Sequence, residues 1–223
     1  MAGSALLGSR ERDDAYVRAH LEPLLGASLP PAQRQDLDVY LTELRSWGAR
    51  LDLVAPRDAD EFLDLALCDA AIVARTEATR GASHDSVIDV GSGGGAPGIP
   101  LAILLGALRG SAQLTLVEPR AKRVTFLRSV TSRLTTVRID VVKGRSDGLP
   151  AGSASVAVAR ATLPPGEWLG EGARLATGAV WVLLARGTPP ERPGWQVDAD
   201  VEYAWPLVRH ARRALRYVPA TPG

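Results

Sequence analysis

Residues 87–98 read Val87-Ile88-Asp89-Val90-Gly91-Ser92-Gly93-Gly94-Gly95-Ala96-Pro97-Gly98. The mostly apolar start of this stretch predicts a buried strand, its glycines predict a tight turn with positive φ, and the residues that follow predict a helix. Such a turn lets a ligand approach the backbone closely, and the helix that follows offers free N–H groups. The stretch therefore predicts a ligand site at a strand end, but dinucleotide-binding proteins share the pattern, and a turn without a ligand is the alternative.

Two carboxylates accompany the glycine-rich turn. Asp89 lies at the strand end before the glycines, where an acidic side chain can hold the methionine amino group of S-adenosylmethionine, directly or through water. Glu118 ends the next apolar run, where a carboxylate can accept hydrogen bonds from both ribose hydroxyls. The spacing from Gly91 to Glu118 exceeds the roughly 20 residues of the dinucleotide fingerprint, yet NAD would make the same ribose contact. Glu118 alone leaves S-adenosylmethionine, NAD and a solvated strand-end charge open.

Short apolar runs alternate with helical patterns from Ser86 onward. This alternation is typical of an α/β fold, a parallel sheet with helices on both faces. Two final strands joined by a short connection predict an antiparallel terminal pair, which fits class I methyltransferases better than dehydrogenases. We expect a mostly parallel seven-stranded sheet. The predicted strands are 87–90, 113–117, 137–142, 155–159, 179–184, 195–205 and 212–218, and the helices among them are 98–108, 120–134 and 164–176.

The first 80 residues have a helical pattern instead. Apolar residues recur every three or four positions, which predicts three helices: 14–25, a second that starts at Pro30 and stops at Gly48, and 60–74. Residues 1–12 are predicted to be a disordered leader. The expected organisation is therefore an N-terminal helical extension, 1–80, followed by a methyltransferase domain, 81–223.

Composition narrows the setting of the protein. The chain has 223 residues, 46% of them hydrophobic, which is enough for the core of one domain. Its longest apolar run falls well short of the roughly 20 residues that span a bilayer. The first residues lack the pattern of a secretory signal. The single cysteine, Cys68, cannot form an internal disulfide and is predicted to lie in the core, so we expect a cytoplasmic protein.

Charge is distributed unevenly along the chain. Residues 1–100 carry 9 Arg against 16 Asp and Glu, a balance of −7, whereas residues 101–223 carry 15 Arg and 2 Lys against 9 Asp and Glu, a balance of +8. A basic half can attract a polyanion by counterion release, and Arg makes bidentate contacts with phosphate. A soluble protein with an uneven surface is the alternative.

Four segments resemble the motifs of the RsmG (GidB) family. Residues 89–101, Asp-Val-Gly-Ser-Gly-Gly-Gly-Ala-Pro-Gly-Ile-Pro-Leu, resemble its glycine motif, and the Pro-Gly-Ile-Pro tail is more specific than the glycines. Residues 118–128 resemble its second motif, an acidic residue followed by Lys-Arg and Phe-Leu. Residues 142–147 resemble the third motif, and residues 158–161 resemble the Ser-Arg-Ala segment at the fourth strand end. The resemblance runs from about Tyr40 to Gly187.

The resemblance implies a Rossmann-like class I methyltransferase that uses S-adenosylmethionine to methylate guanine N7 of 16S rRNA in the small ribosomal subunit. Guanine N7 has a free lone pair at neutral pH, so no general base is needed, and alignment and electrostatics can supply catalysis. We expect a monomer with no metal. The expected site residues are Arg160 for catalysis; Asp89, Gly91, Gly93, Gly95, Gly98, Glu118, Arg145, Ser146 and Arg160 for the cofactor; and Lys122, Arg123 and Arg186 for RNA.

Arg160 has two expected roles: it contacts the carboxylate of the cofactor or orients the target base. Together with Lys122, Arg123 and Arg186, it lies near the carboxyl end of a strand, where open α/β sheets bind ligands. Ordinary solvated charge is the alternative for all four residues.

The chain departs from the family pattern in its N-terminal half. The family has Asn-Leu-Thr where this chain has Asp52-Leu53-Val54, and it has His and Ser where this chain has Ala66 and Ala70. A family Lys near the fifth strand end is replaced by Arg186. Asp52 adds negative charge near an anionic target, which disfavours RNA binding. A divergent paralogue that acts on another acceptor, and a non-catalytic binding protein, therefore stay open.

Overall fold

The computed structural model describes residues 9–51, 53–80 and 86–220. Within this part of the chain, seven strands form one sheet in the order β3-β2-β1-β4-β5-β7-β6. Strands β1 to β5 pair in parallel, and β7 pairs antiparallel with both β5 and β6. The strands are β1 (Ser86–Val90), β2 (Gln113–Glu118), β3 (Arg138–Lys143), β4 (Ala154–Ala159), β5 (Ala176–Leu184), β6 (Trp195–Ala204) and β7 (Ala211–Pro219). The predicted fold class is confirmed.

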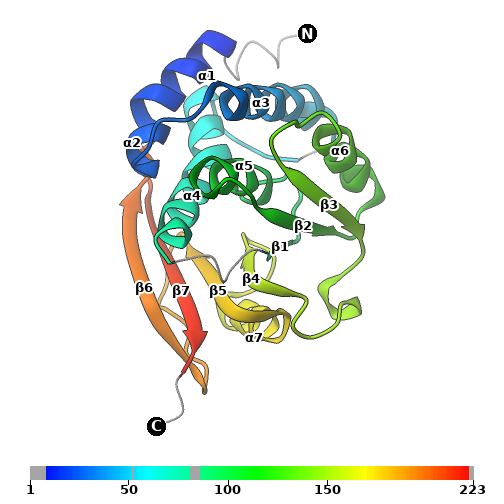
Figure 1. The fold of residues 1–223 in the computed structure, drawn as a ribbon, viewed down its shortest axis with the longest axis vertical. Helices are drawn as coiled ribbons and strands as arrows, with labels where there is room; N and C mark the ends of the chain where they lie inside the picture. The colour runs from blue at the N-terminus through cyan, green and yellow to red at the C-terminus, as the bar shows by residue number, and fades with distance from the viewer. Residues whose placement is uncertain (1–8, 52, 81–85, 221–223) are drawn as a thin grey trace.

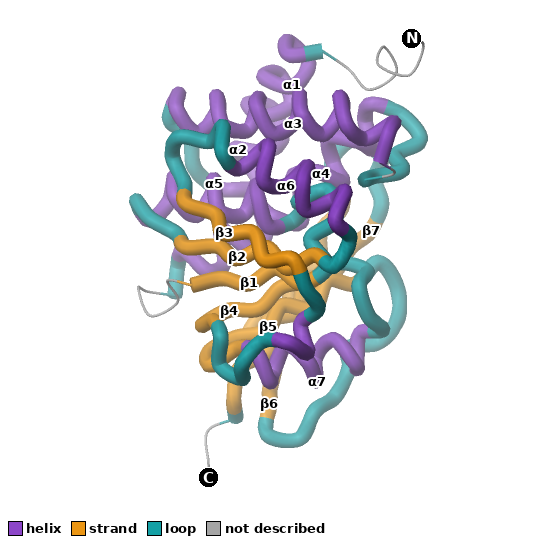
Figure 2. Tube along the Cα trace, turned by 90° about the vertical axis from the view of Figure 1, so that its right-hand side faces the viewer, coloured by secondary structure: helices purple, strands orange, loops and turns teal. Residues whose placement is uncertain are grey.

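Helices cover both faces of this sheet. Figures 1 and 2 show α3, α4, α5 and α6 on one side and α7 on the other, with β6 and β7 extending from the sheet as a long antiparallel arm. The helices are α1 (Arg10–Tyr16), a π-helical segment (Val17–Leu21), α2 (Glu22–Leu25), α3 (Pro31–Leu51), α4 (Ala59–Ala78), α5 (Gly98–Arg109), α6 (Ala121–Thr131), a 3₁₀ turn (Ser146–Gly148) and α7 (Pro165–Leu175).

Helix α5 is apolar all round because it is enclosed. Every residue from Gly98 to Gly106 is buried, with the sheet beneath the helix and α4 against it. One apolar cluster includes Leu44 of α3, Leu67 of α4, Ile103 of α5 and Leu116 of β2. Burying each such side chain stabilises the fold by about 1.5–3 kcal/mol. The N-terminal helices thus share a core with the sheet, and the expected division at residue 80 stays a prediction.

The N-terminal helices differ from their prediction in two places, at the start of α1 and at the end of α3. Residues 1–8, part of the predicted leader, lie outside the described residues, but α1 already begins at Arg10, so residues 10–12 are helical. The Ser9 side chain caps it by accepting a hydrogen bond from the Arg12 N–H at 3.4 Å. Gly48 does not stop α3, which continues to Leu51. A glycine within a helix costs only about 1 kcal/mol, and packing offsets that amount here because Leu51 lies against the core.

Helix α4 also holds the turn between β6 and β7. The fully buried Asp64 carboxylate accepts hydrogen bonds from the backbone N–H groups of Leu207 and Val208, both at 2.9 Å. Its other oxygen accepts the Tyr16 hydroxyl at 2.8 Å, and Cys68 is fully buried beside it, as predicted for a core residue. A buried carboxylate needs such partners, so Asp64 fixes the end of the β6–β7 arm against α4.

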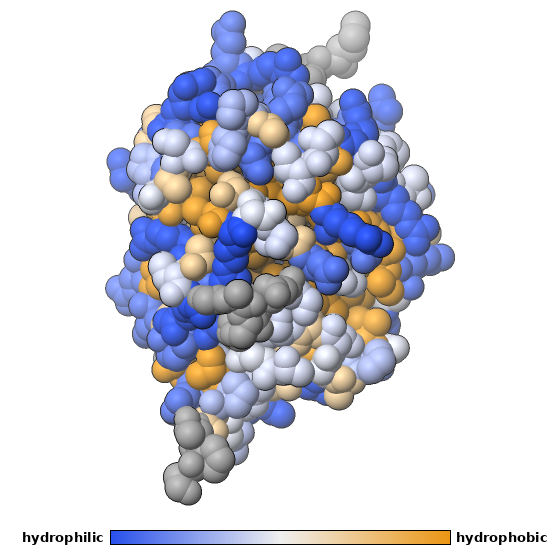
Figure 3. Space-filling model, in the orientation of Figure 1, coloured by the Kyte–Doolittle hydropathy of each residue, from blue (hydrophilic) through white to orange (hydrophobic). Residues whose placement is uncertain are grey.

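The outer surface is mixed in character. On the face seen in Figure 3, hydrophilic side chains are densest at the upper end, around α1 and α3, and apolar residues form smaller patches between polar ones. No helix in the described ranges combines the length and the apolar character that crossing a bilayer requires.

Candidate functional site

The glycine-rich loop between β1 and α5 follows the predicted turn. Gly91, Gly93 and Gly95 all have positive φ, between 53° and 87°, a conformation that glycine adopts without steric penalty. The Gly91 N–H donates to the Val117 carbonyl at 2.8 Å, so the loop continues the pairing of β1 with β2. The peptide bond between Ala96 and Pro97 is cis. The loop therefore turns sharply at the carboxyl end of β1 and presents backbone to one side.

That side is the wall of a cavity of about 540 Å³, called the first cavity below. It lies at the carboxyl ends of β1, β2 and β4, where open α/β sheets bind their ligands. The structure brings seven of the predicted site residues to its wall: Gly91, Gly93, Glu118, Arg123, Arg145, Ser146 and Arg160. Backbone, one carboxylate and several guanidinium groups thus surround one space.

Glu118 is a wall residue with both oxygens engaged. The residue is buried, at 2% exposure. Oε2 accepts a hydrogen bond from the Gly93 N–H at 3.0 Å, and Oε1 accepts one from the Arg120 N–H at 2.8 Å. Each carboxylate oxygen has a second lone pair, so Glu118 retains acceptor capacity toward the cavity. The carboxylate therefore braces the glycine loop and can still accept hydroxyl groups, so its predicted ribose contact stays a prediction.

Asp89 lies behind the loop rather than on the cavity wall. Its Oδ2 accepts a hydrogen bond from the Gly98 N–H at 3.2 Å, and the residue is 1% exposed. A Cβ added at Gly98 would stand 2.5 Å from that oxygen, so the glycine permits close approach of the helix to the strand. Gly95 and Gly98 are likewise not among the lining residues. The contacts of these three residues with a cofactor stay predictions, and their positions indicate a supporting role for the loop.

Burial gives Asp89 a pH-dependent effect on stability. It raises the pKa of Asp89 to about 7, more than the opposing hydrogen bond from Gly98 lowers it. The folded protein therefore binds a proton that the unfolded chain releases at a pH of about 3.9, and stability falls as pH rises from about 4 to about 7.

Asp89→Asn is expected to remove this dependence. The free energy of unfolding of the wild type, relative to that of the variant, should fall by up to about 4 kcal/mol across the window, at about 1.4 kcal/mol for each pKa unit. Urea unfolding of both proteins at pH 4.5 and pH 7.5 measures the difference between their free energies of unfolding at each pH. The contributions of the other titrating groups are the same in both proteins and cancel in this difference. A difference that is constant or rises with pH contradicts the assigned burial.

Arg160 follows β4 and stands at the boundary of two cavities. Its Nη1 donates to the Leu65 carbonyl at 2.5 Å and to Asp69 Oδ2 at 3.2 Å, both from α4. The next residue, Ala161, has a φ of 55°, which is uncommon for a residue with a side chain. Backbone of this kind is concentrated at functional sites. The strand end thus places Arg160 and Thr162 on one wall, which the two cavities share.

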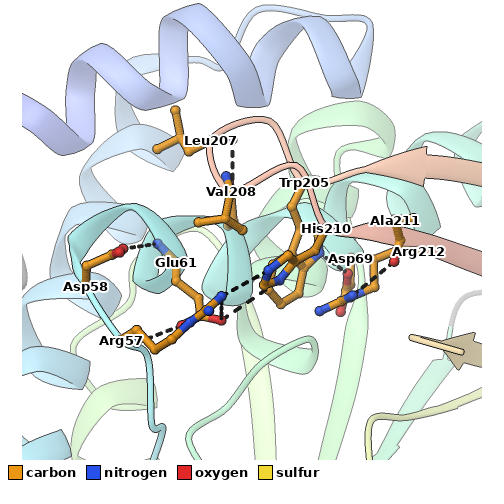
Figure 4. A network of polar contacts seen from close by, with 11 residues as sticks. Arg57, Asp58, Glu61, Asp69, Trp205, Leu207, Val208, His210, Ala211 and Arg212 are labelled. Atoms are coloured by element: carbon orange, nitrogen blue, oxygen red, sulfur yellow. Dashed lines mark hydrogen bonds and ion pairs between the residues drawn. The ribbon is translucent and has the colours of Figure 1, made fainter.

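The second cavity has a volume of about 580 Å³ and shares Leu65 and the segment 160–163 with the first. Tyr203, Trp205 and Arg212 form its far side. The Arg212 guanidinium lies 3.9 Å from the Trp205 ring centroid, a cation–π contact. Figure 4 shows Trp205 and Arg212 at the β6–β7 turn beside His210, whose Nε2 lies 3.0 Å from Arg57 Nη2. An aromatic and cationic wall suits a flat, electron-rich ligand.

The predicted RNA-binding residues are spread over the site. Arg123 lines the first cavity from α6, whereas Lys122, its neighbour, is exposed and lines neither cavity. Arg186 is exposed at the end of β5 and lines the second cavity. The structure therefore brings Arg123, Arg160 and Arg186 to the cavities at one edge of the sheet. RNA contact by Lys122, Arg123 and Arg186 stays a prediction.

Several wall residues were missed from the sequence. Thr162, whose Oγ1 donates to the Val90 carbonyl at 2.9 Å, closes the first cavity over Gly91. Tyr203, Trp205 and Arg212 come from the C-terminal arm, where only strands were expected. Their aromatic and basic character was the available signal, but the return of β7 beside β5 could not be derived from local pattern.

The residues at which the chain departs from the family pattern lie in different parts of the structure. Val54, one of the positions where the chain departs from the pattern that it resembles, lines the first cavity, whereas Ala66 and Ala70 are buried in α4 and line neither cavity. Asp52 lies outside the described residues. In the described part of the chain, no group of three or more His, Cys, Asp or Glu side chains is placed to hold a metal ion.

Comparison with known proteins agrees with this geometry. Residues 33–189 match the family GidB, described as rRNA small subunit methyltransferase G. A ribosomal RNA small subunit methyltransferase G of Leptothrix cholodnii is 33% identical over 79% of this chain and 80% of its own length. The protein of that name from Mycobacterium leprae is 37% identical over 86% of this chain and 69% of its own length. Among solved structures, a mutant of MtNAS has a TM-score of 0.52 at 14% identity, covering 98% of this chain and 83% of that one.

The strand order, the glycine loop after β1 and the carboxylate that ends β2 define a Rossmann-like α/β protein of the methyltransferase class. Within this class, the chain belongs to the GidB family, the family of rRNA small subunit methyltransferase G. The family predicted from the four motifs is confirmed, and so is the class of enzyme.

Proposed function

We propose that this protein transfers a methyl group from S-adenosylmethionine to guanine N7 of 16S rRNA in the small ribosomal subunit. The observation that carries the proposal is the shared wall at Arg160: a nucleoside-sized cavity built on the glycine loop opens beside a second, aromatic cavity. Membership in the GidB family supports the donor and the acceptor together. Two adjoining cavities provide what a transfer between two bound molecules requires, since proximity supplies much of the rate.

The first cavity fits S-adenosylmethionine. A Cβ at Gly91 would stand 2.4 Å from Thr162 Oγ1, so only glycine leaves this part of the wall open. The Glu118 carboxylate suits the ribose hydroxyls, and the segment of Arg145 and Ser146 suits the adenine edge. The Glu118 carboxylate on the wall also favours a ligand with net positive charge, as on a sulfonium and an amino group. When bound, the sulfonium supplies the methyl group.

The second cavity is proposed to receive the acceptor guanine. The N7 lone pair is free at neutral pH, so the protein need not remove a proton before attack. Arg160 donates its remaining N–H groups either to the carboxylate of the donor or to guanine O6, and both choices leave N7 open. Arg186 and Arg212 also line this cavity, and we assign them to contact with phosphate. The chain's own contribution is therefore alignment, exclusion of water and a fixed cation.

The proposal is tested by methyl transfer in vitro. Purified protein is incubated with deuterium-labelled S-adenosylmethionine and with small subunits, or naked 16S rRNA, from cells that lack this gene. Nucleosides from the digest are then analysed by mass spectrometry. Labelled 7-methylguanosine at about one per rRNA is expected, and comparison of the two substrates shows which one the enzyme uses. Absence of label from both substrates, with intact donor binding, contradicts the proposal.

Glu118→Ala is expected to weaken S-adenosylmethionine binding by about 1–3 kcal/mol, because it removes an acceptor for the ribose hydroxyls. It also leaves the Gly93 and Arg120 N–H groups without their hydrogen-bond acceptor. Glu118→Gln is the matched control: it keeps one acceptor oxygen and should lose less affinity. Isothermal titration calorimetry measures both Kd values. Equal affinity in the wild type and Glu118→Ala would show that the carboxylate serves the loop alone.

A divergent paralogue with another acceptor is the second candidate. The observation that favours it is Val54, an apolar side chain on the first-cavity wall at the position of a polar residue in the family. Loss of a polar group there alters what the cavity can hydrogen-bond. Label on an acceptor other than rRNA, in the experiment above extended to total RNA and protein, would support this candidate.

We further propose that the protein acts as a monomer in the cytoplasm and without a metal. The substrate supports the location, since rRNA is cytoplasmic in bacteria. A reaction at guanine N7 supports the absence of a metal, because no water or hydroxyl must be activated. Light scattering of the purified protein tests the oligomeric state, and transfer in the presence of EDTA tests the metal.

A further inference from the structure

A single carboxylate on α4 joins three parts of the site. Asp69 Oδ1 accepts hydrogen bonds from the Tyr203 hydroxyl at 2.8 Å and from the Trp205 indole N–H at 3.0 Å. Its Oδ2 accepts one from Arg160 Nη1 at 3.2 Å. The Asp69 side chain is 4% exposed, and Figure 4 shows it directed toward Trp205. Asp69 thus bonds the end of β4 to the far side of the second cavity.

The bonding at Oδ1 fixes the direction of Oδ2. Two donors, from β6 and the turn after it, hold one oxygen of Asp69. They set the plane of the carboxylate independently of Arg160. Charge-assisted hydrogen bonds are short and directional, and they are stronger in a buried setting. The Arg160 guanidinium therefore meets a fixed anion and, at the same nitrogen, the Leu65 carbonyl. Both anchors act on Nη1.

The rest of the Arg160 guanidinium faces the cavities. The side chain is 20% exposed and lines both of them. Among the described residues, no hydrogen bond to its Nε or Nη2 is present. One corner of a rigid, planar fork is thus held from α4, and the remaining N–H groups are aimed at the ligand space. Without Asp69, the guanidinium would keep only the carbonyl contact and could swing about it.

We propose that Asp69 is a positioning residue for methyl transfer. It holds Arg160 on the wall between the two cavities and locks the Tyr203 and Trp205 side of the second cavity to the same point, so that donor and acceptor walls keep one spacing. This inference rests on the proposed function, because it requires that Arg160 act in transfer. Asp69 acts through Arg160 and performs no chemical step itself.

The test is a double-mutant cycle on the full-length protein with small subunits as acceptor. Asp69→Asn, Arg160→Gln and the double variant are compared in kcat/KM for rRNA under single-turnover conditions, and in Kd for S-adenosylmethionine by calorimetry. Asp69→Asn alone should lower kcat/KM about 10- to 100-fold, the effect of losing a hydrogen bond to a charged group. In the Arg160→Gln background the same change should lower it less than threefold further, because the residue through which Asp69 acts is already gone.

Asp36→Asn is the matched control. Asp36 is likewise a buried carboxylate that accepts backbone N–H groups, but these belong to Thr135 and Thr136, and Asp36 lines neither cavity. Its kcat/KM should stay within threefold of wild type even where the melting temperature falls. If Asp69→Asn does not fold, Asp69→Glu, which keeps the charge but shifts it by one methylene, goes through the same cycle with the same criteria.

The outcomes are separable. An inactive wild-type protein contradicts the proposed function itself. An active wild type whose Asp69 variant loses no more activity than Asp36→Asn overturns the positioning role. Losses that multiply in the Arg160→Gln background also overturn it, because Asp69 would then act on a ligand or on the fold independently of Arg160.

Discussion

Arg160→Ala should lower methyl transfer to small-subunit rRNA by roughly 100- to 1,000-fold, the range measured when one preorganised electrostatic donor is removed from an active site. The guanidinium stands on the wall that the two cavities share, with one nitrogen anchored to α4. Its removal deletes the fixed cation and opens the wall between donor and acceptor. Single-turnover transfer, with enzyme in excess over small subunits, measures the rate directly.

The donor affinity of the same variant distinguishes the two roles of Arg160. A Kd for S-adenosylmethionine weakened about 10- to 100-fold indicates a contact with the donor carboxylate, whereas an unchanged Kd assigns Arg160 to the acceptor base. Arg75→Ala is a suitable control because Arg75, also on α4, donates to the Leu24 carbonyl and lines neither cavity. Transfer by Arg160→Ala within threefold of wild type would contradict a role for this residue in the site.

Gly91→Ala should weaken S-adenosylmethionine binding by at least about 30-fold. The added Cβ would lie 2.4 Å from Thr162 Oγ1 and 2.5 Å from its Cγ2, and φ at this position is +71°. Positive φ costs an alanine about 1–2 kcal/mol, and overpacking costs about 1–3 kcal/mol more. The free protein relieves this strain by moving the loop, and binding must then restore the strained arrangement. Calorimetry gives the change in Kd.

Gly110→Ala separates the clash from the backbone strain. Gly110 has a φ of +83°, close to that of Gly91, but a Cβ there meets no atom within 4 Å. This variant should lose a similar amount of backbone stability and bind the donor as the wild type does. Adding Thr162→Ala to Gly91→Ala should recover part of the affinity, because it removes the clashing atoms. Equal donor affinity in Gly91→Ala and Gly110→Ala would mean that the loop does not form the donor wall.

The sheet could be predicted from the sequence because its strands are short apolar runs that have no helical periodicity. Each predicted strand lies within three residues of the observed bounds. The largest error is at β5, which starts at Ala176 rather than at 179, inside the predicted helix. Alanine suits either structure, and pairing of Ala176 with Ala154 on β4 decides the outcome. Such pairing depends on residues that are distant in sequence, so the local periodicity of the sequence cannot predict it.

The helical part was less predictable for the same reason. Gly48 is a good stop signal in isolation, but α3 continues because its last turn packs on the core. The start of α1 at Arg10 depends on the Ser9 cap and on exposed ion pairs, which carry no apolar signal. Tertiary packing overrides weak local preference in the first case and supports a polar helix in the second.

The candidate site was predictable where one segment carries it. The glycine loop and Glu118 are local features, and they line the first cavity together. Asp89 shows the limit: the pattern gave its position in the strand but not its direction, and its carboxylate faces the helix N-terminus instead of the cavity. The wall formed by Tyr203, Trp205 and Arg212 needs the antiparallel return of β7, so only the structure brings it to Arg160.

We propose that this protein methylates one guanine of 16S rRNA at N7, where its first and second cavities meet. Mass spectrometry of nucleosides from 16S rRNA tests it most directly, in cells with the gene, without it, and without it but carrying the Arg160→Ala form. The deletion should lose one 7-methylguanosine per 16S rRNA, which the intact gene restores and the Arg160→Ala form does not. An unchanged content of 7-methylguanosine in the deletion strain, or full restoration by the Arg160→Ala form, would contradict it.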